Sequence, residues 1–206
     1  IAIITTTIVC IIIVFIIVLN NGKYNDAIAL MDGKYNDAIA LMDAGNIVEA
    51  YEALVALDGY KDSTDKANSI YVQYIVEKLK VAKAGDYVFF GTYEQDNNTS
   101  NGKEDIEWLV LEVKDGKALV ISKYALDCKP YNTSYKNVTW ETCTHRKWLN
   151  NDFLGSAFST EEKAMIPTVT VSADKNLICN SNPGNATQDR VFLLSITEAN
   201  EYFSSD

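Results

Sequence analysis

The sequence is poor in histidine and cysteine, two residues that often build catalytic and metal sites. It contains a single histidine, His145, which excludes any site that needs two histidines. No pair of cysteines has the Cys-x-x-Cys spacing of a structural zinc site. The four cysteines, Cys10, Cys128, Cys143 and Cys179, are too sparse for a disulfide framework, although one pair could form outside the cytoplasm. We therefore expect no cofactor and no metal ion.

Positive charge is scarce as well. The chain has 18 Lys and Arg residues against 28 Asp and Glu residues, which gives a formal net charge of −10. Proteins that bind nucleic acids neutralise phosphates with a basic stripe or patch, and this sequence has none. Nucleic acids are therefore not expected among its partners.

A long apolar run opens the sequence. Residues 1–19 carry no charge, and the threonines at 5–7 are their only polar side chains. This length suits a helix that crosses a hydrocarbon core about 30 Å thick. A cleaved signal peptide is the alternative, but its apolar region is usually shorter and ends at a small-x-small site. We expect residues 1–20 to be a transmembrane helix or uncleaved signal anchor, with the acidic body outside the cytoplasm.

Residues 22–84 have the pattern of short amphipathic helices. The eleven residues 22–32 recur unchanged at 33–43, and apolar positions at helical spacing follow in 47–54 and 67–82. Gly22 and Gly33, which open the two copies, favour a helix break or cap. The region resembles tetratricopeptide-type hairpins, with room for one or two units. It is expected to be a spacer, and a peptide-binding groove is the alternative.

From residue 85 onward the pattern changes to strands mixed with short helices, which predicts an α+β domain over 85–206. Helices are expected at 144–158, after a capping box at 159–162, and after a second capping box at 195–198. The expected strands are 87–90, 106–113, 118–121, 169–171 and 191–194, with an Asp115-Gly116 hairpin turn.

Four stretches of this region carry a family resemblance: GDYVFFGTYEQDNNTSNGKEDIEWLVLEV, ALVISKYALDCKPYN, TWETCTHRKWLNNDF and VFLLSITEANEYF. Over residues 84–206 they resemble domain of unknown function 6273. Members of that family are typically exported by gut-type Firmicutes, often behind a membrane helix and helical repeats. The resemblance implies a C-type-lectin-like core that continues beyond Asp206. It transfers no catalytic residue.

A polar loop offers the strongest candidate ligand site. It joins aromatic rings to amide and hydroxyl groups, the mixture by which proteins hold sugars, since rings stack on C–H faces while amides bond hydroxyls. We predict ligand contacts from Tyr131, Asn132, Tyr135 and Trp140. The alternative is a surface loop that collects tyrosine and asparagine without binding anything.

Residues 96–107 superficially resemble a calcium loop, with Asp96 first and Glu107 in twelfth place. The glycine, Gly102, comes one place late, and Lys103 intrudes among the ligand positions. Strands flank the segment where a calcium loop has helices. An ordinary hairpin loop is therefore expected here.

These observations favour a non-enzymatic, extracytoplasmic binding module on a single-pass cell-membrane anchor, with a glycan or surface protein as its partner. Cys143 and His145 make a poor nucleophile pair, because residues two apart on a helix point away from each other. The alternative is an exported enzyme that acts on wall or glycan and carries its catalytic residues after Asp206. A purely structural envelope protein is a third possibility.

Overall fold

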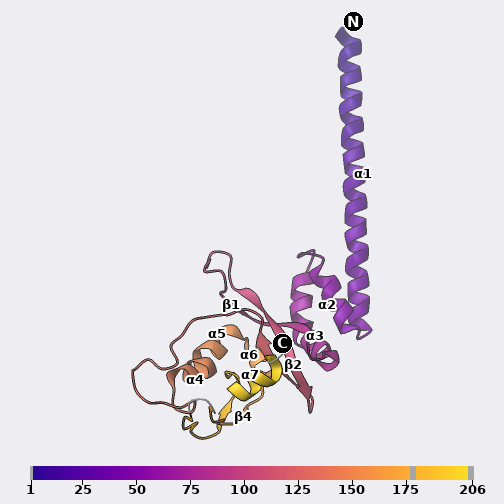
Figure 1. Ribbon diagram of the computed structural model, residues 1–206. Helices are drawn as coiled ribbons and strands as arrows, with labels where there is room; N and C mark the ends of the chain where they lie inside the picture. Colours follow the sequence, from indigo (N-terminus) through magenta and orange to yellow (C-terminus); the bar gives the residue numbers. More distant parts are fainter. Residues whose placement is uncertain (1, 177–179, 204–206) are drawn as a thin grey trace. The chain divides into compact units, whose positions relative to one another are not determined.

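The chain folds into two compact units, Ile1–Lys78 and Leu79–Asp206. The computed structural model describes residues 2–176 and 180–203, with side chains described from residue 22 onward. Over these residues the protein is mixed α+β, with both sheets in the second unit (Figure 1). The region boundaries expected from the sequence, 1–20, 22–84 and 85–206, stay predictions.

Helix α1 (Ala2–Asp43) runs without a break through the first unit (Figure 1). The predicted transmembrane helix is not seen, because the described residues contain no helix that is both long and apolar enough to cross a membrane. Helix α1 continues past residue 20 into a charged segment that begins with Lys23 and Asp26.

The two identical eleven-residue copies both lie within α1, and their glycines do not interrupt the helix. A methyl group at Gly33 would meet no atom within 4 Å. The environments of the copies differ. Tyr24 of the first copy is 67% exposed, whereas its counterpart Tyr35 is half-buried and donates its hydroxyl to Asp62. The two identical copies therefore have the same secondary structure. Their exposure differs because the second copy packs against the following helices and the first does not do so at Tyr24.

Helix α1 ends in a glycine cap. Gly45, at a φ of +79°, donates its N–H to Met42 O, and Asn46 N–H bonds Leu41 O, which together make a Schellman motif. Helices α2 (Ile47–Val55) and α3 (Ser63–Val81) follow. The apolar core of this unit is built from small and branched side chains of the three helices and the turn after α2: Ala38, Ala50, Leu54, Leu57, Ala67 and Ile70.

The second unit begins with a three-stranded antiparallel sheet in the order β1-β2-β3. Its strands are β1 (Tyr87–Tyr93), β2 (Glu104–Lys114) and β3 (Lys117–Ser122). Asp115 and Gly116 join β2 to β3 with positive φ angles of 50° and 70°, as a two-residue hairpin turn requires. The predicted strands and the predicted turn are confirmed here.

A helical segment covers one face of this sheet. Helix α4 (Thr144–Trp148) continues through a π-helical turn, η1 (Leu149–Phe153), into α5 (Leu154–Ala157). Its apolar side chains pack on Ile106 and Trp108 of β2. The predicted helix over 144–158 is confirmed as this segment.

Gly91, at a bulge in β1, lets the strand approach the helical segment closely. A β-carbon there would lie 2.5 Å from the Phe158 ring and 2.7 Å from Ala157 O. The Gly91 N–H is satisfied by Glu162 Oε1 at 3.0 Å. Glu162 also closes the predicted capping box with Ser159 at the start of α6 (Thr160–Met165), so one carboxylate joins the strand to the helix.

The remaining elements are the paired strands β4 (Val169–Val171) and β5 (Thr187–Asp189), and helix α7 (Ile196–Phe203) with its predicted Ser195–Glu198 capping box. The predicted strand at 191–194 is wrong, because the only strand in this stretch is β5, which ends before it. The side chain of Asn150 takes the backbone groups of Val191 that a neighbouring strand would have used.

Candidate functional site

The polar loop between Asp127 and Thr139 is fixed at the N-terminus of α4. His145 N–H donates to Tyr131 O at 3.2 Å, and Thr144 N–H donates to Asn132 Oδ1 at 3.2 Å. The loop also donates one bond to the helix, from Thr133 N–H to Thr144 Oγ1 at 2.9 Å. The first N–H groups of a helix have no partner within the helix. The loop provides acceptors for two of these N–H groups, Tyr131 O and Asn132 Oδ1. The same bonds hold the loop in place, although it has no regular secondary structure.

The two tyrosines of the loop differ in their surroundings. Tyr135 is fully exposed, while Tyr131 is 45% exposed. Partial burial, and then the neighbouring Cys143 thiol, raise the pKa of the Tyr131 hydroxyl to about 12. The side-chain nitrogen of Asn132 is already bonded within the loop, because Nδ2 donates to Ser134 O at 2.7 Å. Of the predicted ligand residues, the two tyrosines therefore present the most free surface.

Trp140, the fourth predicted ligand residue, lies elsewhere. Its ring packs against the apolar core, and its indole N–H donates to Asp189 Oδ2 at 3.0 Å. A buried indole N–H normally needs such a partner. The structure thus places Trp140 in a buried polar network, while Tyr131 and Asn132 lie at the start of α4.

That network centres on Asp189, which is 1% exposed. Besides Trp140, its carboxylate accepts from Arg146 Nε at 2.7 Å and from Thr187 Oγ1 at 2.6 Å. Arg146 also donates from Nη1 to Glu141 O at 3.2 Å and from Nη2 to Gln188 O at 3.1 Å. A buried charge is tolerated when it is paired and its hydrogen bonds are made, which is the case here.

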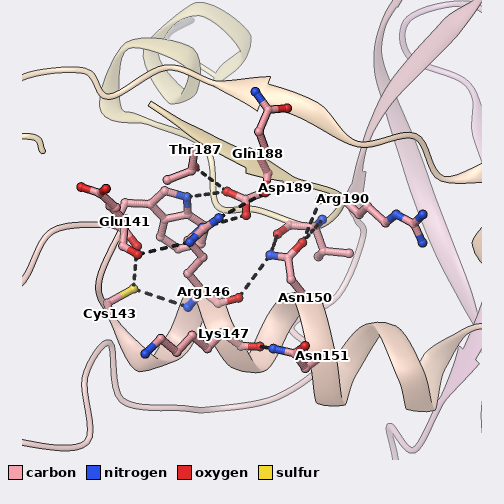
Figure 2. Close-up of polar contacts among 12 residues, drawn as sticks. Glu141, Cys143, Arg146, Lys147, Asn150, Asn151, Thr187, Gln188, Asp189 and Arg190 are labelled. Atoms are coloured by element: carbon pink, nitrogen blue, oxygen red, sulfur yellow. Dashed lines mark hydrogen bonds and ion pairs between the residues drawn. The ribbon is translucent and has the colours of Figure 1, made fainter. Parts of the chain in front are cut away.

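Asn150 extends the same network from the next turn of the helical segment. Its Nδ2 donates to Arg146 O and to Val191 O, and its Oδ1 accepts the N–H groups of Arg190 and Val191. Figure 2 shows Arg146 and Asn150 pointing from the helix toward the segment that carries Asp189. The network thereby ties the segment after β5 to α4.

Sequence reasoning missed this network. Asp189 and Arg146 are 43 positions apart, and neither belongs to a motif. The usable signal was Asn150, an amide with low helix propensity on a predicted helix and on the same face as Arg146. A polar side chain on a helix at such a position often has a buried partner.

The thiol of Cys143 and the imidazole of His145 have separate partners. Cys143 is fully buried, and its sulfur accepts from Arg146 N–H and donates to Trp140 O, both at 3.4 Å. The His145 ring packs edge-on against Trp148, with centroids 5.7 Å apart. Cys143 acts as the N-cap of α4, which is a structural role.

The loop between β1 and β2 gathers carboxylates. Ligand oxygens of Glu94, Asp96 and Glu104 all lie within 4.8 Å of one another, so these are the described residues that could hold a cation. Glu107, the twelfth residue of the calcium-like sequence, is instead paired with Lys123 at 2.7 Å. Asp96 accepts from Asn98 N–H, as in an ordinary turn. The hairpin-loop interpretation therefore fits the contacts better than a calcium loop.

An exposed aromatic surface on the first sheet was also missed. Tyr87 and Phe89 alternate along β1 and are 49% and 55% exposed. The ammonium group of Lys123 lies 4.8 Å from the Tyr87 ring centroid and 5.2 Å from that of Tyr124, and it pairs with Glu107. The unbroken run of apolar residues at 87–90 was a signal that both faces of this strand carry apolar side chains.

Comparison with known proteins gives one match. Residues 115–206 match the family model of a domain of unknown function (DUF6273). This supports the DUF6273 family for that segment, which starts in the β2–β3 turn, whereas the sequence resemblance was drawn over 84–206. No curated protein and no solved structure matches the chain. The match lends no support to a membrane helix, to tetratricopeptide-like hairpins or to a lectin-like core.

Proposed function

We propose that the chain is a non-enzymatic binding module that contacts its ligand through Tyr135 and Tyr131, and that the ligand is a neutral glycan. The proposal rests above all on one observation. The loop of residues 127–139 is pinned to α4 by three hydrogen bonds and yet presents Tyr135 fully to solvent.

A fixed loop with exposed tyrosines is well suited to binding. Ordering a flexible loop on binding costs free energy, and a loop that is already held avoids most of this cost. Tyrosine adds a large contact surface with few rotatable bonds to freeze. Its ring stacks on the C–H face of a sugar and its hydroxyl can bond sugar hydroxyls.

Charge favours a ligand without negative groups. The chain carries a net charge of −10, which repels anionic polymers. The cation nearest to Tyr131 in sequence, Lys129, is already paired with Asp127 at 3.2 Å and lies over the Trp148 ring. The other lysine of residues 127–139, Lys136, is a single positive charge on a chain of net charge −10.

The test uses an array of neutral and acidic oligosaccharides, probed with the wild-type chain, with Tyr135→Ser and with Tyr124→Ser. Tyr124 is a matched control, because it is 59% exposed but lies outside the loop. Binding to neutral sugars should fall by about tenfold or more in Tyr135→Ser, as for an aromatic hot spot, and should persist in Tyr124→Ser. Equal binding by Tyr135→Ser, or no binding to neutral sugars, would contradict the proposal.

A further inference from the structure

The loop between β1 and β2 contains an asparagine followed by glycine, Asn101-Gly102. In such a pair the backbone nitrogen of the second residue can attack the side-chain amide carbon of the first. Glycine favours this step, because without a β-carbon it shields its own nitrogen little and its backbone moves freely. The step is slow wherever the backbone is held in a helix or a strand.

Here the backbone is open. Asn101 and Gly102 are exposed and precede the first residue of β2. Gly102 has a φ of +91°, and a β-carbon on it would meet nothing within 4 Å. Asn101 N–H closes a short turn onto Asn98 O at 3.1 Å, which leaves its side chain at the end of the turn. The side-chain amide of Asn101 is held by Asp96 Oδ2 at 2.9 Å, a bond between exposed groups that has to break before the Gly102 nitrogen attacks.

We propose that Asn101 is a site of spontaneous deamidation. The Gly102 nitrogen bonds to the Asn101 side-chain carbon, the bond from that carbon to the amide nitrogen breaks, and ammonia leaves with the proton lost by Gly102. Water then opens the five-membered imide at either carbonyl, which leaves aspartate or isoaspartate at position 101. The reaction needs water alone and transfers no electrons.

Deamidation would change the charge of the neighbouring cluster of three carboxylates, Glu94, Asp96 and Glu104. Asn101 Nδ2 now donates to Asp96 Oδ2 at 2.9 Å, and this bond is the main reason that the pKa of Asp96 lies below its usual range. A carboxylate at 101 cannot donate, and it adds a fourth negative charge beside Glu94, Asp96 and Glu104. Like charges repel, so the loop loosens and the pKa of Asp96 rises.

The same dipeptide occurs a second time and serves as an internal control. Asn21-Gly22 lies within helix α1, where the backbone N–H groups are hydrogen-bonded along the helix. The helix has to open locally before the Gly22 nitrogen can reach the preceding side chain. The two sites share their chemistry and differ in backbone environment.

The experiment incubates the full chain at mildly alkaline pH and follows both sites by peptide mapping with mass spectrometry, with isoaspartyl methyltransferase labelling as a second readout. Asn101 should convert at least about tenfold faster than Asn21. Asn101→Gln should remove the labelled species from that peptide. The proposal is overturned if Asn101 stays intact while a synthetic peptide of residues 96–106 converts, or if Asn21 converts as fast.

A second measurement tests the consequence. Trypsin cleavage after Lys103 should be faster in Asn101→Asp than in the wild type, and Asn101→Ser should lie between them, because it loses the donated amide bond without adding charge. Equal cleavage rates for Asn101→Asp and Asn101→Ser would show that the added charge does not loosen the loop.

Discussion

Two polar regions contact the short helix α4, and they use their polar groups in opposite ways. The network around Asp189 has a buried carboxylate at its centre, and each charged group in it has a protein partner. The loop of residues 127–139 uses backbone and amide groups to hold itself on the helix and leaves the Tyr135 ring in solvent. The difference separates a structural polar site from an exposed one. The first joins distant segments of the chain, and the second leaves in solvent the tyrosines that we propose contact a ligand.

The largest expected effect comes from the network around Asp189. Asp189→Ala leaves the partly buried Arg146 guanidinium without its carboxylate partner and should lower the free energy of unfolding by about 3 kcal/mol, the lower end of the range for a broken buried ion pair. Urea denaturation followed by tryptophan fluorescence measures this. Asp174→Ala, an exposed carboxylate of the same unit, should change the value by about 0.5 kcal/mol or less. Similar small changes in both variants would show that the network does not hold the fold.

Asn150→Ala should have the next largest effect. It removes the amide that satisfies Val191 N–H and O and so leaves backbone groups unpaired, at a cost of about 2–3 kcal/mol. Its neighbour Asn151 is a matched control, since it is exposed and its Nδ2 bonds Lys147 O (Figure 2). Urea denaturation of Asn150→Ala and Asn151→Ala compares the two, and an equal loss of stability would show that the bonds from Asn150 to Val191 add nothing beyond those of an exposed amide.

In the loop of residues 127–139, Asn132→Ala removes the bond to Thr144 N–H. We expect a loss of about 1 kcal/mol, the usual value for a helix cap. Hydrogen exchange at Thr144 should speed up in this variant, while exchange within β2 stays unchanged. If hydrogen exchange at Thr144 were as slow in Asn132→Ala as in the wild type, the Asn132 side chain would not hold the loop on α4.

The smallest expected effect concerns alkaline pH. The pKa of Tyr131 is about 12 in the folded chain, above the ordinary value of 10.0, so folding favours the neutral hydroxyl. The raised pKa therefore adds to the free energy of unfolding. This stabilisation is fully present below pH 10 and is lost as the pH rises toward 12. Thermal unfolding of Tyr131→Phe should therefore show a smaller loss of stability over this range than wild type does. If wild type and Tyr131→Phe lost stability equally over this pH range, the raised pKa of Tyr131 would be contradicted.

Much of the second unit was predictable, because its signals are local. The Asp115-Gly116 turn and the capping boxes at Ser159 and Ser195 depend on neighbouring residues, and each is present as expected. The failures involve contacts between distant residues. The apolar stretch 191–194 has the composition of a strand, but Asn150, about 40 positions earlier, takes the backbone bonds of Val191.

The first unit gives a similar lesson. Helical periodicity predicted its helices, but the glycines that favoured a break lie within α1, since packing of the second copy on α2 outweighs the weak preference of one glycine. Residues 1–20 were assigned a membrane span on composition alone, which the described helices do not support. Of the predicted ligand residues, Trp140 could not be placed from the sequence because its partner, Asp189, is 49 positions away.

We propose that Tyr135 serves binding and does not serve folding. The most direct test measures two properties of Tyr135→Ser in parallel: thermal unfolding of the chain, and its affinity for the neutral oligosaccharide that the array selects. We expect an unfolding midpoint equal to that of the wild type, because the ring is fully exposed, and an affinity lower by about tenfold or more. An unchanged affinity, or a loss of affinity that accompanies a lower unfolding midpoint, would contradict it.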